Sequence, residues 1–239
     1  MFYFLFSSLL NYNLFLIAAA VIPAVFLMMK VYQLDRLEQE SPALLWTLVK
    51  AGIFSALIAL VAERVLSSLL GMVVPYNHPA YSVLLYFVVV ACSEEGAKYF
   101  MLHRRTWLSP EFNCQYDGVV YAVFVSLGFA LWENISYVLH YGFSTAVVRA
   151  VTAIPGHTCF GVFMGVFYGL ARKAENQGES DNSLIFRICT VLVPVLLHGA
   201  YDYIASTNTN TWYFVAFIAA LFIVSYWLVV RMSREDRRI

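Results

Sequence analysis

Two glutamates and a lysine lie inside a stretch of sequence that is otherwise apolar enough to cross a membrane. Residues 91–100 read A-C-S-E-E-G-A-K-Y-F, which places Glu94, Glu95 and Lys98 directly after an apolar run. On a helix, Lys98 lies one turn from both glutamates and can reach either carboxylate. The two glutamates point about 100° apart, so we expect one to pair with Lys98 and the other to face a cavity. A charge at bilayer depth costs at least ~2.5 kcal/mol, which favours a functional site over a purely structural ion pair.

Acid–base and metal-binding residue types recur in three later apolar segments. Glu133 and Asn134 follow F-A-L-W, His157 follows A-I-P-G, and His198 precedes Asp202 by one helical turn. His157 lies ~18 Å into its segment from the outside, whereas His198 and Glu133 lie ~21 and ~22 Å into theirs from the inside, at 1.5 Å per residue. Because the segment boundaries are uncertain by ~6 Å at this rise, a shared layer is permitted. Neutral imidazole and carboxylate groups suit zinc, and a further carboxylate can take a proton from water. The motif H-E-x-x-H is absent, so a zinc site would have to be assembled from different helices.

Each of these residues also has a structural explanation. A membrane histidine can simply pack between helices, and His198 and Asp202 can share a local hydrogen bond. Burial can leave Glu133 protonated, and Pro155–Gly156 can be no more than a kink. Two histidines and four carboxylates spread over four neighbouring segments nevertheless favour a site for metal-assisted or acid–base hydrolysis.

The composition is that of an integral membrane protein. Of 239 residues, 61% are hydrophobic and 13% are charged, whereas a soluble domain is about 45–50% apolar and ~25% charged. The zero formal net charge gives no indication of a nucleic-acid partner. Seven apolar segments predict an all-α polytopic bundle. We expect it to form one transmembrane domain over 1–239, with its motifs in 80–204. The segments cover about 13–29, 43–61, 80–102, 118–139, 145–171, 184–204 and 212–230.

The distribution of basic residues predicts the orientation. Lys and Arg follow the first, third, fifth and seventh segments, whereas loops 72–79, 140–144 and 205–211 contain none. This places the N-terminus outside and the C-terminus in the cytoplasm. Arg64 and Arg149 are exceptions, which we expect to snorkel outward. The four scattered cysteines predict neither a disulfide nor a thiolate zinc site, and the start M-F-Y-F-L-F predicts no cleaved signal peptide.

Three of the motifs resemble a known family. E-E-G-A-K at 94–98, F-A-L-W-E at 129–133 and H-G-A-Y-D at 198–202 match E-E-x-x-K, F-x-x-x-E and H-x-x-x-D. These are motifs of the PrsW family of intramembrane metalloproteases. Supporting matches are Y-Q-L-D-R at 32–36 and P-G-H at 155–157, so the resemblance runs from the first loop to the sixth segment. One departure is E-Q-E-S-P in the first loop, where the family tends to have E-P-E-P.

The PrsW family is in turn similar to the CAAX prenyl proteases and the bacterial immunity-type membrane proteases. In those relatives a glutamate and a histidine are thought to activate water without a structural need for zinc. Where they have a histidine, this chain has Glu133, and it has an additional histidine, His157. The difference favours a metal in this chain.

The resemblance implies a multi-pass protease of the bacterial cell (inner) membrane that cleaves single-pass membrane proteins such as anti-sigma factors. We expect His157 and His198 to bind zinc together with Glu133 or Asp202.

We expect Glu94 or Glu95 to act as the general base, with Lys98 holding the other, and Asn134 to donate to the developing oxyanion. The alternatives are a metal-free glutamate/histidine protease, a catalytically inactive scaffold, or an ion-coupled transporter. Carboxylates and histidines within spans also form proton relays, but a transporter predicts inverted repeats that are not evident here.

Overall fold

The expected apolar segments are helices in a computed structural model that describes residues 2–207 and 210–239, with side chains from Asn11 onward. The helices are α1 (Phe2–Gln33), α2 (Pro42–Val73), α3 (Ala80–Val83), the π-helix η1 (Leu84–Ala91), α4 (Cys92–Thr106), α5 (Asp117–Tyr141), α6 (Phe143–Val151), α7 (Ala153–Asn176), α8 (Ser180–Ser206) and α9 (Thr211–Arg234). Helices α3, η1 and α4 are continuous, and α6 leads directly into α7. The described residues therefore form seven helical segments long and apolar enough to cross a membrane, as predicted.

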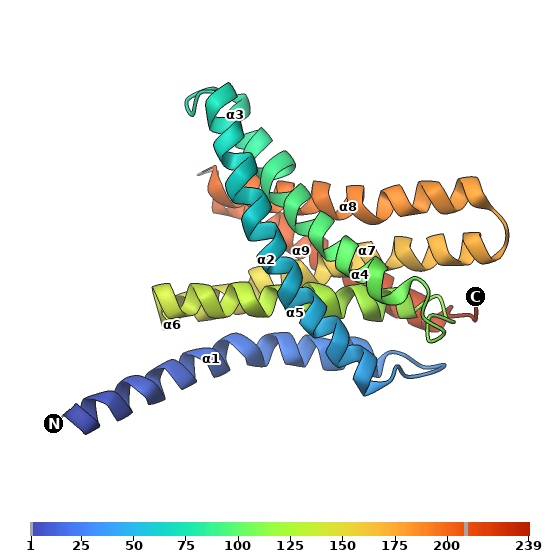
Figure 1. Ribbon diagram of the computed structural model, residues 1–239, viewed down its shortest axis with the longest axis horizontal. Helices are drawn as coiled ribbons and strands as arrows, with labels where there is room; N and C mark the ends of the chain where they lie inside the picture. Colours follow the sequence, from blue (N-terminus) through green and yellow to red (C-terminus); the bar gives the residue numbers. More distant parts are fainter. Residues whose placement is uncertain (1, 208–209) are drawn as a thin grey trace.

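Helix α5 is the centre of the bundle. Every residue from Asp117 to Leu131 is buried, and α1, α2, α4 and α7 pack around this helix (Figure 1). Large apolar side chains on the outer helices are exposed, for example Trp227 on α9 and Phe54 on α2. Such a surface suits contact with lipid rather than water.

Helix α2 crosses α5 at backbone contact. A methyl group added at Gly52 would lie 2.1 Å from the carbonyl oxygen of Val125, and one added at Gly128 would lie 2.3 Å from that of Val49. Small residues allow membrane helices to approach this closely. Helix α2 is also longer than the expected segment 43–61 and continues through Glu63 to Val73, because no proline interrupts it before Pro75.

Two irregularities in the helices precede the residues singled out above. The π-helical stretch η1 ends at Ala91, directly before the helix that carries Glu94 and Glu95. The expected kink at Pro155–Gly156 is instead a break at Thr152, which has φ −122° and ψ −71°. Pro155 then lies in the first turn of α7, where a missing N–H costs nothing. Such interruptions in membrane helices are tolerated where the backbone lines a cavity or is buried in protein.

Candidate functional site

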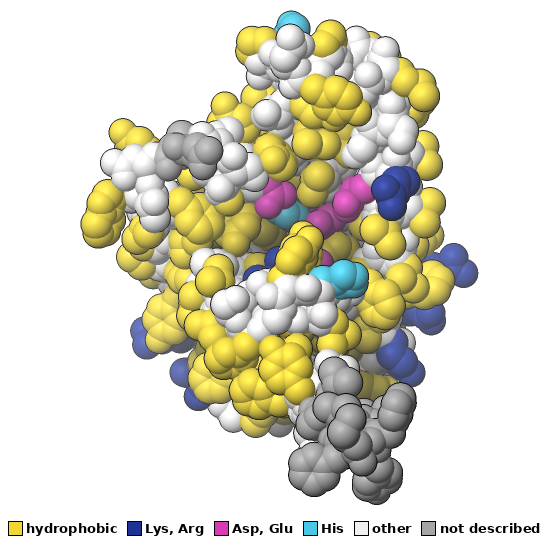
Figure 2. All heavy atoms as spheres, turned by 90° about the vertical axis from the view of Figure 1, so that its left-hand side faces the viewer, with side chains coloured by type: hydrophobic (Ala, Val, Ile, Leu, Met, Phe, Trp, Pro, Cys, Tyr) yellow, Lys and Arg dark blue, Asp and Glu magenta, His cyan; other side chains and the backbone are white. Residues whose placement is uncertain are grey.

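A cavity of about 330 Å³ collects the ionisable residues of five membrane-spanning segments. It lies in the half of the bundle nearest Gly142 and the loop 74–79, and opens between hydrophobic surfaces (Figure 2). Its ionisable lining residues are Glu63 (α2), Glu94 (α4), Glu133 and Tyr137 (α5), Arg149 (α6), His157 (α7), and His198, Tyr201 and Asp202 (α8), together with Tyr86 of η1. All four metal ligands expected from the sequence are therefore in one cavity.

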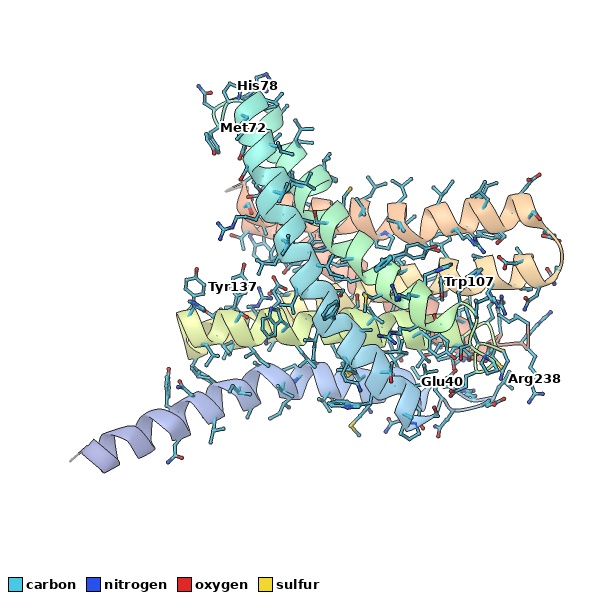
Figure 3. The ribbon with its side chains drawn as sticks, viewed as in Figure 1. Glu40, Met72, His78, Trp107, Tyr137 and Arg238 are labelled. Atoms are coloured by element: carbon cyan, nitrogen blue, oxygen red, sulfur yellow. The ribbon has the colours of Figure 1, made fainter. Side chains whose placement is uncertain are left out.

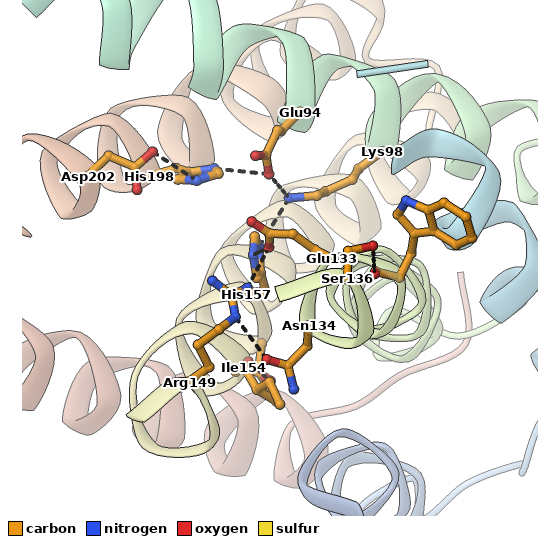
Figure 4. A network of polar contacts seen from close by, with 12 residues as sticks. Glu94, Lys98, Glu133, Asn134, Ser136, Arg149, Ile154, His157, His198 and Asp202 are labelled. Carbon is orange, nitrogen blue, oxygen red and sulfur yellow. Dashed lines mark hydrogen bonds and ion pairs between the residues drawn. The ribbon is translucent and has the colours of Figure 1, made fainter. Parts of the chain in front are cut away.

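Lys98 joins three of the site residues, two of which, Glu94 and His157, are labelled in Figure 4. Its Nζ lies 3.2 Å from Glu94 Oε2, 2.7 Å from Glu95 Oε1 and 3.2 Å from His157 Nδ1. An ammonium group has three N–H donors, so these contacts use all of them. The side chain is fully buried, and its Nζ also lies 4.0 Å from the centre of the Phe129 ring. The expectation that Lys98 holds only one glutamate is therefore wrong, because one long side chain lies between both carboxylates.

The contact with Lys98 determines how His157 is protonated. A charged lysine can only donate, so Nδ1 of His157 accepts. Nε2 then carries the ring proton and donates to Glu133 Oε2 at 2.9 Å. Arg149 Nη2 donates to the same Glu133 oxygen, also at 2.9 Å. Both ring nitrogens of His157 are thus engaged, and Glu133 is held by two donors.

The two glutamates have different surroundings. Glu95 has no exposed surface, and its Oε1 accepts from His198 Nδ1 at 2.8 Å as well as from Lys98. Glu94 lines the cavity, with Oε2 3.9 Å from His198 Nδ1. On the other side of its ring, His198 Nε2 lies 3.4 Å from Asp202 Oδ2. Glu94 is consequently the glutamate that faces the cavity, and Glu95 lies behind it.

Asn134 does not contribute to the cavity. Its Nδ2 donates to the backbone oxygen of Ala20 on α1 at 3.0 Å, and its Oδ1 accepts from Arg149 Nε at 2.8 Å. Because it follows Glu133 by one residue, it points about 100° away around α5. The expectation that Asn134 donates to an oxyanion is wrong, since its amide is fully buried and used elsewhere.

Arg149 and Glu63 are site residues that were not expected from the sequence. The prediction that Arg149 snorkels outward is wrong, because Gly142, with φ +84°, turns the chain back and α6 directs Arg149 toward Glu133. Its guanidinium also lies 4.1 Å from the centre of the Tyr137 ring. Glu63 reaches the cavity because α2 continues beyond the expected segment. The available signal was a charge within an apolar segment for Arg149, and a charge just past the end of one for Glu63.

The donor types in the cavity fit a transition metal. Glu94, Glu95 and His157 each offer a ligand atom within 4.8 Å of the others, but Lys98 Nζ already contacts all three residues. His198 Nε2 and Asp202 are free of Lys98 and lie on the cavity wall. Two imidazoles with several carboxylates form the ligand set that zinc prefers. His157 differs from His198 because both of its ring nitrogens are already hydrogen-bonded, to Lys98 and to Glu133. To bind a metal, His157 would have to give up one of these two hydrogen bonds.

Comparison with known proteins agrees with the motifs. The sequence model described as "PrsW family intramembrane metalloprotease" matches residues 40–230. The chain is 29% identical over 223 residues to Protease PrsW of Oceanobacillus iheyensis, covering 92% of this chain and 96% of that protein. It is 31% identical to Protease PrsW of Geobacillus kaustophilus, covering 93% and 92%, and 28% identical to that of Bacillus subtilis, covering 94% and 96%. No solved structure matches the chain.

Proposed function

Because the chain belongs to the PrsW family of intramembrane proteases, we propose that it is a zinc-dependent endopeptidase of the bacterial cell membrane whose substrates are single-pass membrane proteins such as anti-sigma factors. The observation that carries the proposal is the gathering of Glu94, Glu133, His157, His198 and Asp202 around one cavity within membrane-spanning helices. Family membership favours this function over a transporter or an inactive scaffold.

In the proposed reaction Glu94 is the general base. It faces the cavity, where it can take a proton from the attacking water and return it to the leaving amine. Lys98 fixes the Glu94 carboxylate in place, while Glu95 anchors Lys98 and the His198 ring from behind. This arrangement holds the base on rigid, buried partners before substrate arrives.

The metal would be held by His198 and Asp202, with Glu133 or His157 completing the site. When bound there, zinc would polarise the substrate carbonyl and lower the pKa of the attacking water. Arg149 fixes the Glu133 carboxylate and is itself held by Asn134, so both act at a distance from the reacting atoms. Hydrogen bonds of this kind orient the residues that bind a metal directly.

The position of the cavity suggests where a substrate is cut. The lining residues Tyr137 and Ser206 lie near the ends of α5 and α8, and under the predicted orientation these ends are outside. We therefore place the scissile bond near the outer membrane surface, reached from the apolar flanks of the cavity.

The test measures metal content and cleavage together. The purified full chain is reconstituted in liposomes with a single-pass anti-sigma-type reporter, and metal is measured by mass spectrometry. We expect His198→Ala to lose both zinc and cleavage. Glu94→Gln should keep zinc but lose about 10²–10⁴-fold in rate, since only the proton acceptor is removed. Asp181→Asn, an exposed change on α8, is the control and should retain both.

Chelation separates the two chemistries that the site allows. A hydroxamate or thiol chelator should inhibit the wild type, and added zinc should restore cleavage. Full activity with well under one equivalent of transition metal would overturn the zinc proposal. That result would favour the metal-free alternative, in which Glu94 or Glu95 acts with His198, a pairing consistent with the 2.8 Å contact from His198 to Glu95. Failure to cleave any single-pass membrane protein would overturn the substrate class.

A further inference from the structure

A second group of carboxylates lies at the other end of the bundle. Asp35 and Glu40 are in the loop between α1 and α2, and Asp117 is the first residue of α5. One oxygen from each lies within 4.8 Å of the others. The intervening residues 36–39 are exposed, yet Asp35 and Glu40 turn inward and are 4% and 5% exposed. In Figure 3, Glu40 lies at the same end as Arg238 of the C-terminal segment.

Two of these carboxylates have hydrogen-bond partners that fix their direction. Asp117 Oδ2 accepts from the backbone N–H groups of Asn113 and Cys114 at 3.0 and 2.7 Å. Glu40 Oε1 accepts from the Tyr121 hydroxyl at 2.8 Å. The carboxylates are therefore held toward one another rather than toward solvent.

Asp35 is the carboxylate of this group whose oxygens lack hydrogen-bond partners among the described residues. Neither of its oxygens has a hydrogen-bond partner of normal geometry among the described residues, although both are buried; the backbone N–H of Glu38 is near enough only to lower the pKa of Asp35 slightly against the effect of burial. Buried polar groups almost always find a partner, and an exception requires an explanation such as an ion. An Asp that is 96% buried and directed at two more carboxylates points to a cation.

The surrounding charges are mostly negative. Burial is the main cause that raises the pKa of the inner carboxyls, to about 6 for Asp35 and about 7 for Glu40. The negative charges nearby add to this effect: Asp236 and Glu38 act on Asp35, and Glu111 acts on Glu40. Within the described part of the chain, none of the three inner carboxylates is paired with Lys, Arg or His. Arg238 pairs at 3.5 Å with Glu38 on the exposed side of the loop.

We propose that Asp35, Glu40 and Asp117 bind a hard divalent cation, Mg²⁺ or Ca²⁺. Such ions take carboxylate oxygens from several segments of chain, completed by water. The bound ion would hold the α1–α2 loop against the start of α5. The C-terminal segment would be tied in too, because Asp236 Oδ1 accepts from the N–H of Tyr116, next to Asp117, at 2.8 Å.

The cation site is separate from the catalytic cavity. Asp117 precedes Glu133 by 16 residues on α5, which is about 24 Å at 1.5 Å per residue. Its ligands are all oxygens, whereas the catalytic cavity offers imidazoles and suits zinc. Variants at one site therefore leave the ligands of the other in place, and either proposal can fail without the other.

The experiment is thermal unfolding and calorimetric titration of the full chain in detergent after removal of divalent cations. At pH 7.5, Ca²⁺ or Mg²⁺ should raise the melting temperature saturably, by about 5–10 °C at ~100 times the dissociation constant. Asp35→Asn should abolish the shift and the binding heat, while remaining at least as stable as the cation-free wild type. Asp181→Asn, an exposed acidic residue on α8, should keep the full shift.

The pH dependence of the wild type gives a second test that needs no variant. Because the folded-state pKa values are raised from 3.8 and 4.5 to about 6 and 7, the cation-free protein should lose stability as pH rises through this window, and cations should restore it. At pH 5 the carboxyls are protonated and the cation-induced shift should be small. A shift equal in wild type and Asp35→Asn, or no shift and no binding heat at pH 7.5, would overturn the proposal and indicate carboxyls that share protons instead.

Discussion

At the scale of residues, the arrangement of the proposed catalytic cavity depends on one buried lysine. Lys98 contacts two carboxylates and an imidazole, and through them it orders Glu133, His198 and Asp202. Placing a charge in a membrane interior is unfavourable unless it is paired and hydrogen-bonded. Here every donor of the ammonium is used, so the same contacts satisfy the lysine and fix the proposed base.

Lys98→Met should therefore destabilise the protein by about 3–5 kcal/mol, because two buried carboxylates lose their counter-charge. The measurement is unfolding of the purified protein in detergent, with Lys50→Met, an exposed lysine on α2, as control. Combining Lys98→Met with Glu95→Gln should recover part of the loss, since a neutral amide no longer needs the charge. A stable and fully active Lys98→Met protein would contradict the central position of this residue.

At the scale of elements, irregular or closely packed helices hold the site in place. The π-helix η1 ends three residues before Glu94, and the break at Thr152 lies five residues before His157. Gly199, next to His198, brings α8 against η1: an added methyl group would lie 2.5 Å from Phe87 Cδ1 and 3.0 Å from its Cα. The position of His198 thus depends on a close approach that only glycine permits.

Gly199→Ala should push α8 away from η1 and lengthen the contact between His198 and Glu95. We expect a fall in cleavage rate of about 10²-fold, the effect of a displacement near 1 Å, with the fold retained. Gly96→Ala on α4 is the matched control, because no atom lies within 4 Å of the added methyl group and alanine favours the helix by ~1 kcal/mol. Cleavage and melting temperature are measured on both variants, and equal rates would show that α8 is not positioned this way.

At the scale of the whole molecule, the two proposed sites lie at opposite ends of the bundle. The end near Gly142 contains the proposed catalytic cavity, while the end with Asp35 and Asp117 contains the proposed cation site. The basic loops belong to the second end. If they are cytoplasmic, the cavity opens outward and the cation site faces the cytoplasm, where Mg²⁺ is available.

The orientation can be measured by cysteine labelling in intact cells. In a background without the four native cysteines, Asn77→Cys should react with an impermeant maleimide, because the loop 74–79 is predicted to be outside. Gln177→Cys, between α7 and α8, should react only after the membrane is opened. Both positions are exposed and outside the proposed catalytic cavity. The opposite labelling pattern would reverse the orientation, and with it the proposed side of cleavage.

The sequence by itself determined the membrane class, the seven segments and the residue types that gather in the candidate site. These follow from local properties: apolar length, and the cost of placing Glu94, Lys98, His157 or His198 in such a segment. What only the tertiary structure decided is which groups touch. The turn at Gly142 sends Arg149 inward to Glu133, and the rotation of α5 takes Asn134 out of the cavity. Asp35 and Asp117 are 82 positions apart in sequence and become neighbours only when α1 and α5 pack. Contacts between distant segments depend on how the helices cross and rotate, and local spacing in the sequence does not specify either.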